Sequence, residues 1–270
     1  MRSEKIMDQA LTKSERETLK AIWRLTSSPG RASSPGRAIS AGRPSSATAG
    51  DNGGFDGGAR TGDLAEALRV TPGTMTATVK RLADRGLATH APYHGVQLTE
   101  PGRRLAMAVV RRHRIVERFL ANMLGYSWSE ADRLAPTFEH QLPQEIEERL
   151  FAALDRPTTC PHGFPIPGVE TDTLAPLPPL YDLAPGQRAT MALPGSTDPE
   201  MAQFLDRLGL RPGVEVEVLE KHPFDGPLVL RVEGHDRTIG DRVARQILVR
   251  NPKDPYPVQR AVRARKENKT

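Results

Sequence analysis

The chain has 270 residues, of which 37% are hydrophobic and 5% aromatic, and its formal net charge at pH 7 is +5. Because Cys160 is the only cysteine, an intrachain disulfide and a cysteine-rich zinc framework are both excluded. The first residues lack the apolar run of a signal peptide, and no stretch approaches the roughly 18 apolar residues of a membrane span. We therefore expect a soluble, cytoplasmic protein without a membrane partner, whose basic charge permits binding to nucleic acid without demonstrating it.

Residues 26–60 have the composition of an insert rather than of a folded element. They are rich in Gly, Ser and Pro, they repeat SSPGRA at 27–32 and 33–38, and their one aromatic residue is Phe55. Such a segment cannot bury enough apolar surface to offset the entropy lost on ordering. We expect a disordered insert, which is either an expanded loop or a flexible basic arm that touches DNA phosphates.

The residues on either side of the insert predict a DNA-binding domain over 1–98. A capping box at 12–15 begins a first helix, a short helix follows at 63–69, and a turn leads to a helix over 73–84 that Gly86 ends. Two strands are expected at 87–90 and 96–98. This order is typical of a winged helix-turn-helix, although similar helical packing also occurs in proteins that bind no DNA.

The helix over 73–84 is expected to enter the major groove of double-stranded DNA. Small hydroxylated residues at a helix N-terminus allow close approach, and their hydroxyls and the free backbone N–H groups can meet phosphate oxygens. Basic residues at its other end add charge. The predicted DNA-binding residues are Thr71, Gly73, Thr74, Thr76, Thr78, Lys80 and Arg81.

The pattern of the remaining residues predicts helices followed by strands. Helices are expected at about 100–124, 129–140 and 143–154, and the Pro-rich residues 155–180 as an extended linker. Period-two alternation at 214–218 and 228–232, with one helix at about 199–208, predicts a small β-barrel-like domain. The fold class is therefore mostly α with a small β domain, and residues 251–270 form a basic tail.

Polar residues in the helical middle suggest a metal site. His113 and Glu117 lie four residues apart on one predicted helix and so share a face, while Glu139 and His140 are adjacent near the end of the next. Imidazole and carboxylate ligands without thiolate suit Mn²⁺ or Fe²⁺, although Zn²⁺, Co²⁺ and Ni²⁺ can compete. The alternative is surface ion pairing of His113 and Glu117 with the arginines around them, Arg111, Arg112, Arg114 and Arg118.

A second possible ligand pair, Cys160 and His162, occurs in the run Cys-Pro-His-Gly. A single pair cannot complete a tetrahedral site. We expect these two residues to belong to an ordinary loop.

The sequence resembles the diphtheria toxin repressor family of metal-dependent transcription regulators, which includes the manganese transport regulators. The resemblance rests on four stretches: LTKSERETLKAIWRL, LAEALRVTPGTMTATVKRLADRGL, LTEPGRRLAMAVVRRHRIVERFLANMLGYSW, and FEHQLPQEIEERL followed by PTTCPHGFPIPG. It covers roughly 11–25 and 61–168, and more weakly 181–250. It implies a winged helix-turn-helix at 1–98, a helical metal-binding and dimerisation domain at 99–168, a Pro-rich linker at 169–180, and an SH3-like (FeoA-like) β-barrel at 181–250.

The resemblance also implies which residues bind metal. His113 and Glu117 match ligands of the family's ancillary site, where Asp132 replaces the usual histidine. Glu139 and His140 match ligands of the primary site, and Glu17 falls where the iron branch has Met and the manganese branch Asp. Two acidic residues of the third domain, Asp198 and Glu200, lie near the position of a further ancillary ligand. Pro136 departs from the family pattern, because it stands where Cys or Glu supplies a ligand and it has no side-chain donor.

What the resemblance implies about function is a homodimer that binds a palindromic operator when Mn²⁺ or Fe²⁺ is bound and represses genes of metal-ion homeostasis. Such a protein is not an enzyme and has no small-molecule substrate. The primary-type set is expected to control DNA binding, because it spans two domains. One alternative is a winged-helix regulator that has lost metal control through Pro136. Another is a metal-dependent hydrolase, which is disfavoured because the sequence has no His-Glu-x-x-His motif and no nucleophile elbow.

Overall fold

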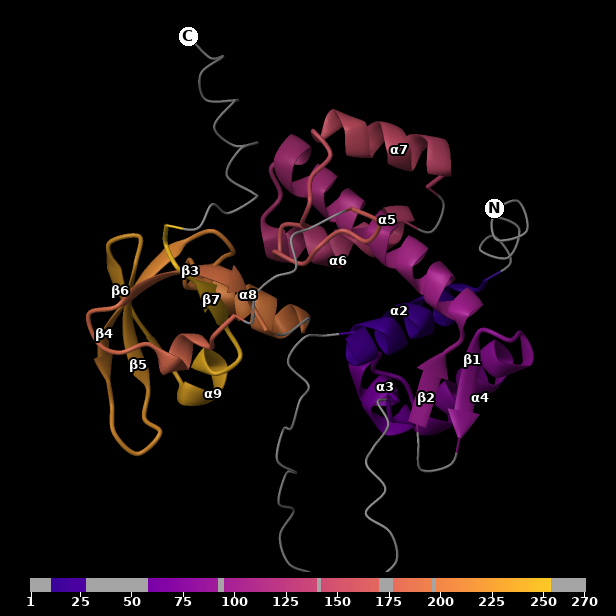
Figure 1. Cartoon of the computed structure of the whole chain (residues 1–270), viewed down its shortest axis with the longest axis horizontal. Coiled ribbons are helices and arrows are strands. Elements are labelled where there is room, and N and C mark those ends of the chain that lie inside the picture. The colour runs from indigo at the N-terminus through magenta and orange to yellow at the C-terminus, as the bar shows by residue number, and fades with distance from the viewer. Residues whose placement is uncertain are drawn as a thin grey trace, which may run out of the picture. The chain divides into compact units, whose positions relative to one another are not determined.

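The computed structural model describes residues 11–27, 58–91, 95–139, 142–169, 177–195 and 198–253. These fall into two compact units, residues 1–107 and 108–270, each of which is described by itself (Figure 1). None of the described helices is both long enough and apolar enough to cross a membrane. Most of the predicted insert and of the basic tail lies outside the described residues.

Unit 1 has the element order predicted for a winged helix. It contains α2 (Lys13–Ser27), α3 (Thr61–Ala67), α4 (Pro72–Asp84), the antiparallel pair β1 (Ala88–Ala91) and β2 (Gly95–Leu98), and the start of α5 (Glu100–Leu124). Apolar side chains from all of these elements form one core. Its largest fully buried members are Leu19, Ile22, Leu64, Met75, Leu82 and Leu87. The winged helix-turn-helix arrangement is therefore confirmed.

The predicted insert over 26–60 overlaps folded elements at both of its ends. Helix α2 continues to Ser27, and at the other end Ala59 forms an antiparallel bridge with Val96, with N–O distances of 2.9 and 2.8 Å. Gly95 has φ +77° there, and a Cβ on it would lie 2.8 Å from the Ala59 carbonyl oxygen. The expectation of disorder is wrong for residues 26–27, because they complete α2, and for residues 58–60, because the wing's backbone pairs with Ala59.

The capping box that begins α2 is confirmed. The Thr12 backbone N–H donates to Glu15 Oε2 at 2.8 Å, and the Glu15 N–H donates to Thr12 Oγ1 at 3.2 Å. Arg85 Nη1 lies 3.3 Å from the same carboxylate. Burial by itself would raise the pKa of Glu15, but the hydrogen bonds from Thr12 and the charge of Arg85 outweigh it and hold this pKa below its usual range.

The helical part of unit 2 is built on the C-terminal half of α5. Helices α6 (Trp128–Glu139) and α7 (Gln144–Ala153) complete it. One apolar cluster joins Ile115 of α5 to Phe151, and another joins Val116 to Ala131. Helix α6 continues for three residues beyond Pro136, although proline has no N–H to donate within a helix.

Residues 155–169 do not form the extended linker that their prolines predict. The segment turns at Cys160–Gly163 and is closed by an antiparallel bridge between Thr159 and Pro165. Ile166 is fully buried against the cluster that contains Ile115 and Phe151. This prediction is wrong because the segment packs on α5, which its own composition does not reveal.

The C-terminal part of unit 2 is a five-stranded antiparallel sheet in the order β6-β5-β4-β3-β7. Its strands are β3 (Arg188–Leu193), β4 (Glu215–Lys221), β5 (Leu228–Val232), β6 (His235–Ile239) and β7 (Leu248–Arg250). The 3₁₀ turn η1 (Leu180–Asp182) and helices α8 (Pro199–Arg207) and α9 (Asp241–Ala244) complete the domain (Figure 1). The alternating valines at 216 and 218 face its core, as the period-two pattern predicts.

Replacing Glu15 with Gln is expected to destabilise the chain by about 1–2 kcal/mol, because the buried acceptor of the capping box loses its charge. Since the pKa of Glu15 is lowered by folding, its contribution is fully present above the ordinary carboxyl pKa and is lost as the pH falls through the lowered value. Urea unfolding at neutral and acidic pH measures both effects. Glu100→Gln, at an exposed ion pair, is the control and should change little; equal losses in the two variants would contradict the prediction.

Candidate metal centre and nucleic-acid interface

Donor atoms from three segments of unit 2 converge on Glu117. Its Oε1 lies 3.2 Å from His113 Nε2 and 3.3 Å from His162 Nδ1. Asp132 Oδ1 lies 3.4 Å from His113 Nε2, and Cys160 Sγ lies 3.9 Å from His162 Nδ1. Two groups with metal-ligand donors therefore share Glu117: one with His113 and Asp132, the other with Cys160 and His162.

The elements explain why these side chains meet. His113 and Glu117 are one turn apart on α5 and both are 2% exposed. Asp132 projects from α6, and the turn at 160–163 brings Cys160 and His162 to the same place. Because His113 and Glu117 are buried, the alternative of a surface ion pair is wrong for them.

Glu139 supports this centre from the other side of the imidazole. Its Oε2 lies 2.5 Å from His113 Nδ1, and its side chain is buried. A carboxylate on one ring nitrogen fixes the ring orientation and makes the other nitrogen a better ligand, as is usual for metal-binding histidines. In this structure Glu139 is thus placed to orient His113, a role that the sequence did not predict.

Cys160 and His162 are the residues that sequence reasoning missed. They were expected in an ordinary loop, because two ligands cannot complete a site by themselves. The structure buries both and brings a third donor, Glu117 of α5, to them. The signal in the sequence was the Cys-Pro-His-Gly run itself, but its partners lie far away in the chain.

The remaining predicted ligands do not belong to the two donor groups among the described residues. Glu17 is in unit 1, on α2, where it pairs with Lys20 at 3.0 Å. His140 lies outside the described residues, so the primary-type set stays a prediction from the resemblance. Asp198 caps α8 by accepting from the Glu200 N–H at 2.9 Å, and neither residue joins the two donor groups among the described residues.

The donors fit a divalent transition metal. Burial, followed by the charge of Glu117, raises the pKa of the Cys160 thiol to about 12, so this thiol is neutral until a cation replaces its proton. Two imidazoles, two carboxylates and one thiol offer both hard and soft donors. Gathering acidic groups in a buried place is costly without a compensating cation.

The helix predicted to bind DNA presents most of its predicted residues to solvent. Thr71 caps α4 by accepting from the Thr74 N–H at 3.2 Å, and Pro72 follows as the first helical residue. Thr76 donates its hydroxyl to the Pro72 carbonyl, which leaves its methyl group for an apolar contact. The exposed residues of the predicted set are Thr71, Gly73, Thr74, Thr76, Lys80 and Arg81.

Thr78 is a correction to this surface. It is 1% exposed, it donates to the Thr74 carbonyl at 3.0 Å, and Ser14 of α2 lies 3.4 Å from its hydroxyl. Thr78 therefore packs between helices of unit 1 and cannot reach a DNA base.

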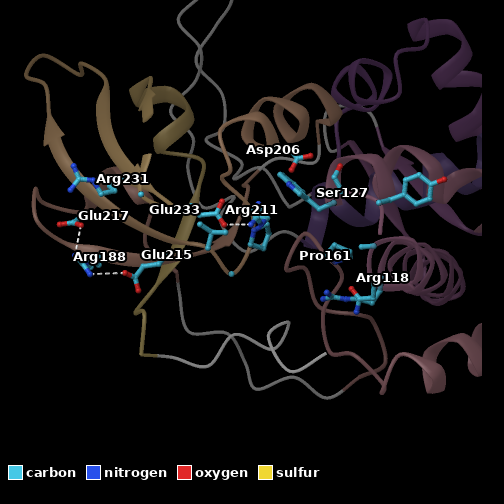
Figure 2. Close-up of a pocket in the computed structure, with 18 residues that line it drawn as sticks. Arg118, Ser127, Pro161, Arg188, Asp206, Arg211, Glu215, Glu217, Arg231 and Glu233 are labelled. Atoms are coloured by element: carbon cyan, nitrogen blue, oxygen red, sulfur yellow. Dashed lines mark hydrogen bonds and ion pairs between the residues drawn. The ribbon is translucent and has the colours of Figure 1, made fainter. Parts of the chain in front are cut away.

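A cavity of about 930 Å³ lies in unit 2, between the helical part and the sheet (Figure 2). Arg118, Trp128 and Pro161 form part of its wall on the helical side. On the sheet side, Arg188 pairs with Glu217 at 3.1 Å and Arg211 pairs with Glu233 at 2.5 Å. These mutual pairs balance the charge of that wall, and we assign no ligand to the cavity.

A winged helix, a helical domain with clustered metal-ligand side chains and an SH3-like sheet together define the architecture of a metal-dependent DNA-binding regulator. Three family matches agree with it. Residues 55–96 match the iron dependent repressor N-terminal DNA binding domain, residues 99–168 its metal binding and dimerisation domain, and residues 179–251 the FeoA domain.

The chain belongs to the family of iron-dependent repressors that includes the diphtheria toxin repressor. It is 31% identical over 197 residues to the diphtheria toxin repressor of Corynebacterium diphtheriae, covering 69% of this chain and 86% of that protein. It is 42% identical over 106 residues to the iron-dependent repressor IdeR of Mycobacterium tuberculosis, covering 39% of this chain and 46% of that protein. The chain thus spans about half the length of the IdeR proteins that it matches.

Solved structures show the same fold. A manganese-dependent transcriptional repressor in complex with manganese is 29% identical, with a TM-score of 0.65 over 87% of this chain and 99% of that one. The manganese regulator SloR, 23% identical with a TM-score of 0.64, covers 89% of this chain and all of that one and supports the fold alone. The expected repressor fold is confirmed by these family matches.

Metal-free protein is expected to resist alkylation at Cys160. Burial and the nearby Glu117 charge raise its pKa to about 12, so the reactive thiolate is scarce at pH 8. Mass spectrometry after iodoacetamide treatment should show slow labelling of the folded chain and fast labelling after addition of urea. Equal rates in the two conditions would mean that the thiol is not buried in solution.

Proposed function

We propose that this chain is a metal-dependent transcriptional repressor that binds a DNA operator as a homodimer in the cytoplasm and controls genes of metal-ion homeostasis. The observation that carries the proposal is the pair of donor groups that share the buried Glu117, one with His113 and the half-buried Asp132 and the other with Cys160 and His162. Both lie within the part of the chain that matches a metal-binding and dimerisation domain. The exposed Thr- and Gly-rich start of α4 supports the DNA-binding part of the proposal.

The proposed cofactor is Mn²⁺ or Fe²⁺. The carboxylates of Glu117 and Asp132 suit both ions, whereas a thiolate and two imidazoles favour Fe²⁺ over Mn²⁺ and also suit Zn²⁺. A bound divalent cation would supply the positive charge that balances the buried carboxylates. The Glu139 carboxylate then holds the orientation of the His113 ring, because its Oε2 lies 2.5 Å from His113 Nδ1.

Control of DNA binding requires that the metal-bound form favours the arrangement that fits the operator. Helix α5 contributes Leu105 and Ala106 to the core of unit 1 and His113 and Glu117 to the metal centre. It is therefore one continuous element through which ligation can act on the DNA-binding unit. The primary-type set of Glu17, Glu139 and His140 is a second proposed route, which rests on the resemblance.

A second candidate function is DNA binding without metal control. It is favoured by Pro136, which lies within α6 and has no donor where the family pattern has a ligand. The buried centre around Glu117 argues against it, because that centre does not use residue 136.

A titration of DNA binding separates these candidates. A duplex selected from a random-sequence pool with the purified chain and Mn²⁺ serves as the probe, and gel shifts are measured with Mn²⁺, Fe²⁺, Zn²⁺ or a chelator. Metal-dependent repression predicts binding about 10- to 100-fold tighter with the activating ion than with chelator. Equal affinity in both conditions would leave the metal-independent alternative.

Glu117→Gln is expected to abolish most of the metal stimulation while leaving the dimer intact, because it removes the carboxylate charge that both donor groups share. The measurements are gel shifts across a metal titration and sedimentation for the oligomeric state. Glu148→Gln on the exposed face of α7 is the matched control. A Glu117→Gln protein with the metal response of the wild type would exclude this centre as the regulatory one.

Changing Thr74 and Thr76 together to Glu should reduce DNA affinity by at least about tenfold, because two like charges would face phosphate. Both residues are exposed, so the fold should persist. Thr238→Glu on an exposed position of β6 is the control for added charge. Unchanged DNA affinity in a folded double variant would refute the assignment of α4 as the DNA-reading helix.

A further inference from the structure

Arg118 joins α5 directly to the turn that carries Cys160 and His162. Its side chain is 3% exposed. Its Nε and Nη2 donate to the Thr159 carbonyl at 2.9 and 2.5 Å, and Nη2 also reaches Thr159 Oγ1 at 3.1 Å and the Cys160 carbonyl at 2.8 Å. A planar guanidinium that donates to several acceptors fixes the orientation of the bound backbone as well as its distance from the arginine. Arg118 therefore clamps the main chain of residues 159 and 160.

The position of this clamp in the sequence matters for the metal centre. Arg118 follows Glu117 on α5, so the helix backbone links the clamp rigidly to the shared carboxylate. On the other side, Thr159 and Cys160 immediately precede His162, and the turn is closed by the Gly163 N–H donating to the Cys160 carbonyl at 2.9 Å. The clamp thus connects the residues that carry the two sets of donors.

Two further arginines of α5 hold the same segment further along. Arg114 donates to the Pro165 carbonyl, and Arg111 donates to the Pro167 carbonyl at 2.8 Å. These two contacts lie after His162 and fasten the returning chain. The contacts of Arg118, by contrast, are made to Thr159 and Cys160, which precede or carry the ligands.

We propose that Arg118 is a positioning residue of the metal centre. It delivers the Cys160 thiol and the His162 imidazole to Glu117, and so makes the centre a mixed thiolate, imidazole and carboxylate site. Without it, the donors left in place are those of α5 and α6, His113, Glu117 and Asp132, which form a harder set. This inference rests on the proposed function of the cluster as a metal site.

Co²⁺ is the probe that tests this role, because cobalt bound by thiolate gives a charge-transfer absorption that imidazole and carboxylate ligands do not give. The wild-type chain should show this absorption and Cys160→Ser should lack it. Arg118→Gln should lose most of it and bind Co²⁺ about 10- to 100-fold more weakly, as is typical when a residue that supports a ligand is removed. The preference for Zn²⁺ over Mn²⁺ should fall in the same variant.

Two controls separate positioning from general structural damage. Arg111→Gln removes a clamp of the same kind from the same segment, at Pro167, and should keep the thiolate absorption. Arg118→Lys keeps the charge but offers one point donor in place of the fork, so it should fold even if Arg118→Gln does not and should still lose the thiolate signal. Thermal unfolding of the metal-free proteins reports whether each variant is folded.

Wild-type absorption and Co²⁺ affinity in folded Arg118→Lys or Arg118→Gln would overturn the role of Arg118 and leave the metal centre standing. Co²⁺ binding by the wild type without the thiolate absorption would overturn it as well, because Cys160 would not be a ligand. If the wild type binds no metal, both this inference and the proposed metal control fail.

Discussion

The constraint on which the metal centre of unit 2 depends is the burial of the Glu117 carboxylate between two imidazoles. Its Oε1 lies 3.2 Å from His113 and 3.3 Å from His162, and the side chain is 2% exposed. An ionised carboxylate is stable in such a place only with a partner that carries positive charge. Protonated histidines can provide that charge, but a divalent cation also accounts for Cys160 and Asp132 being within reach.

The fold of residues 155–169 and the arginines that hold this segment keep His162 beside Glu117. The prolines of 155–169 would suit an extended linker, yet the segment returns to α5 and is held there by three arginines through its carbonyl oxygens. A segment with so little regular structure has few backbone hydrogen bonds of its own, so side-chain donors must supply them. Arg114 and Arg118 are buried, and the cost of burying their guanidinium groups is offset because each donates to carbonyl oxygens of the segment.

Helix α5 contains residues of both units. Its first turns are capped by Thr99, which accepts from the Gly102 N–H at 3.2 Å, and a Cβ on Gly102 would lie 1.8 Å from the Leu87 carbonyl oxygen. This close approach fixes where α5 leaves the winged helix. Further along, the same helix carries His113, Glu117 and Arg118, so a single element contributes to the core of one unit and to the metal centre of the other.

The sequence by itself determined what depends on neighbouring residues: the capping box at 12–15, the Thr71 cap before Pro72, the wing and the alternating strands of the sheet. It also determined that His113 and Glu117 share a helix face, because helical geometry places them one turn apart. Tertiary structure alone decided that Thr78 packs on Ser14 instead of facing DNA, and that Glu139 orients His113. It alone decided that Cys160 and His162 join Glu117, because the clamp from Arg118 to Thr159 spans 41 residues of chain and no local pattern encodes a contact between segments so far apart.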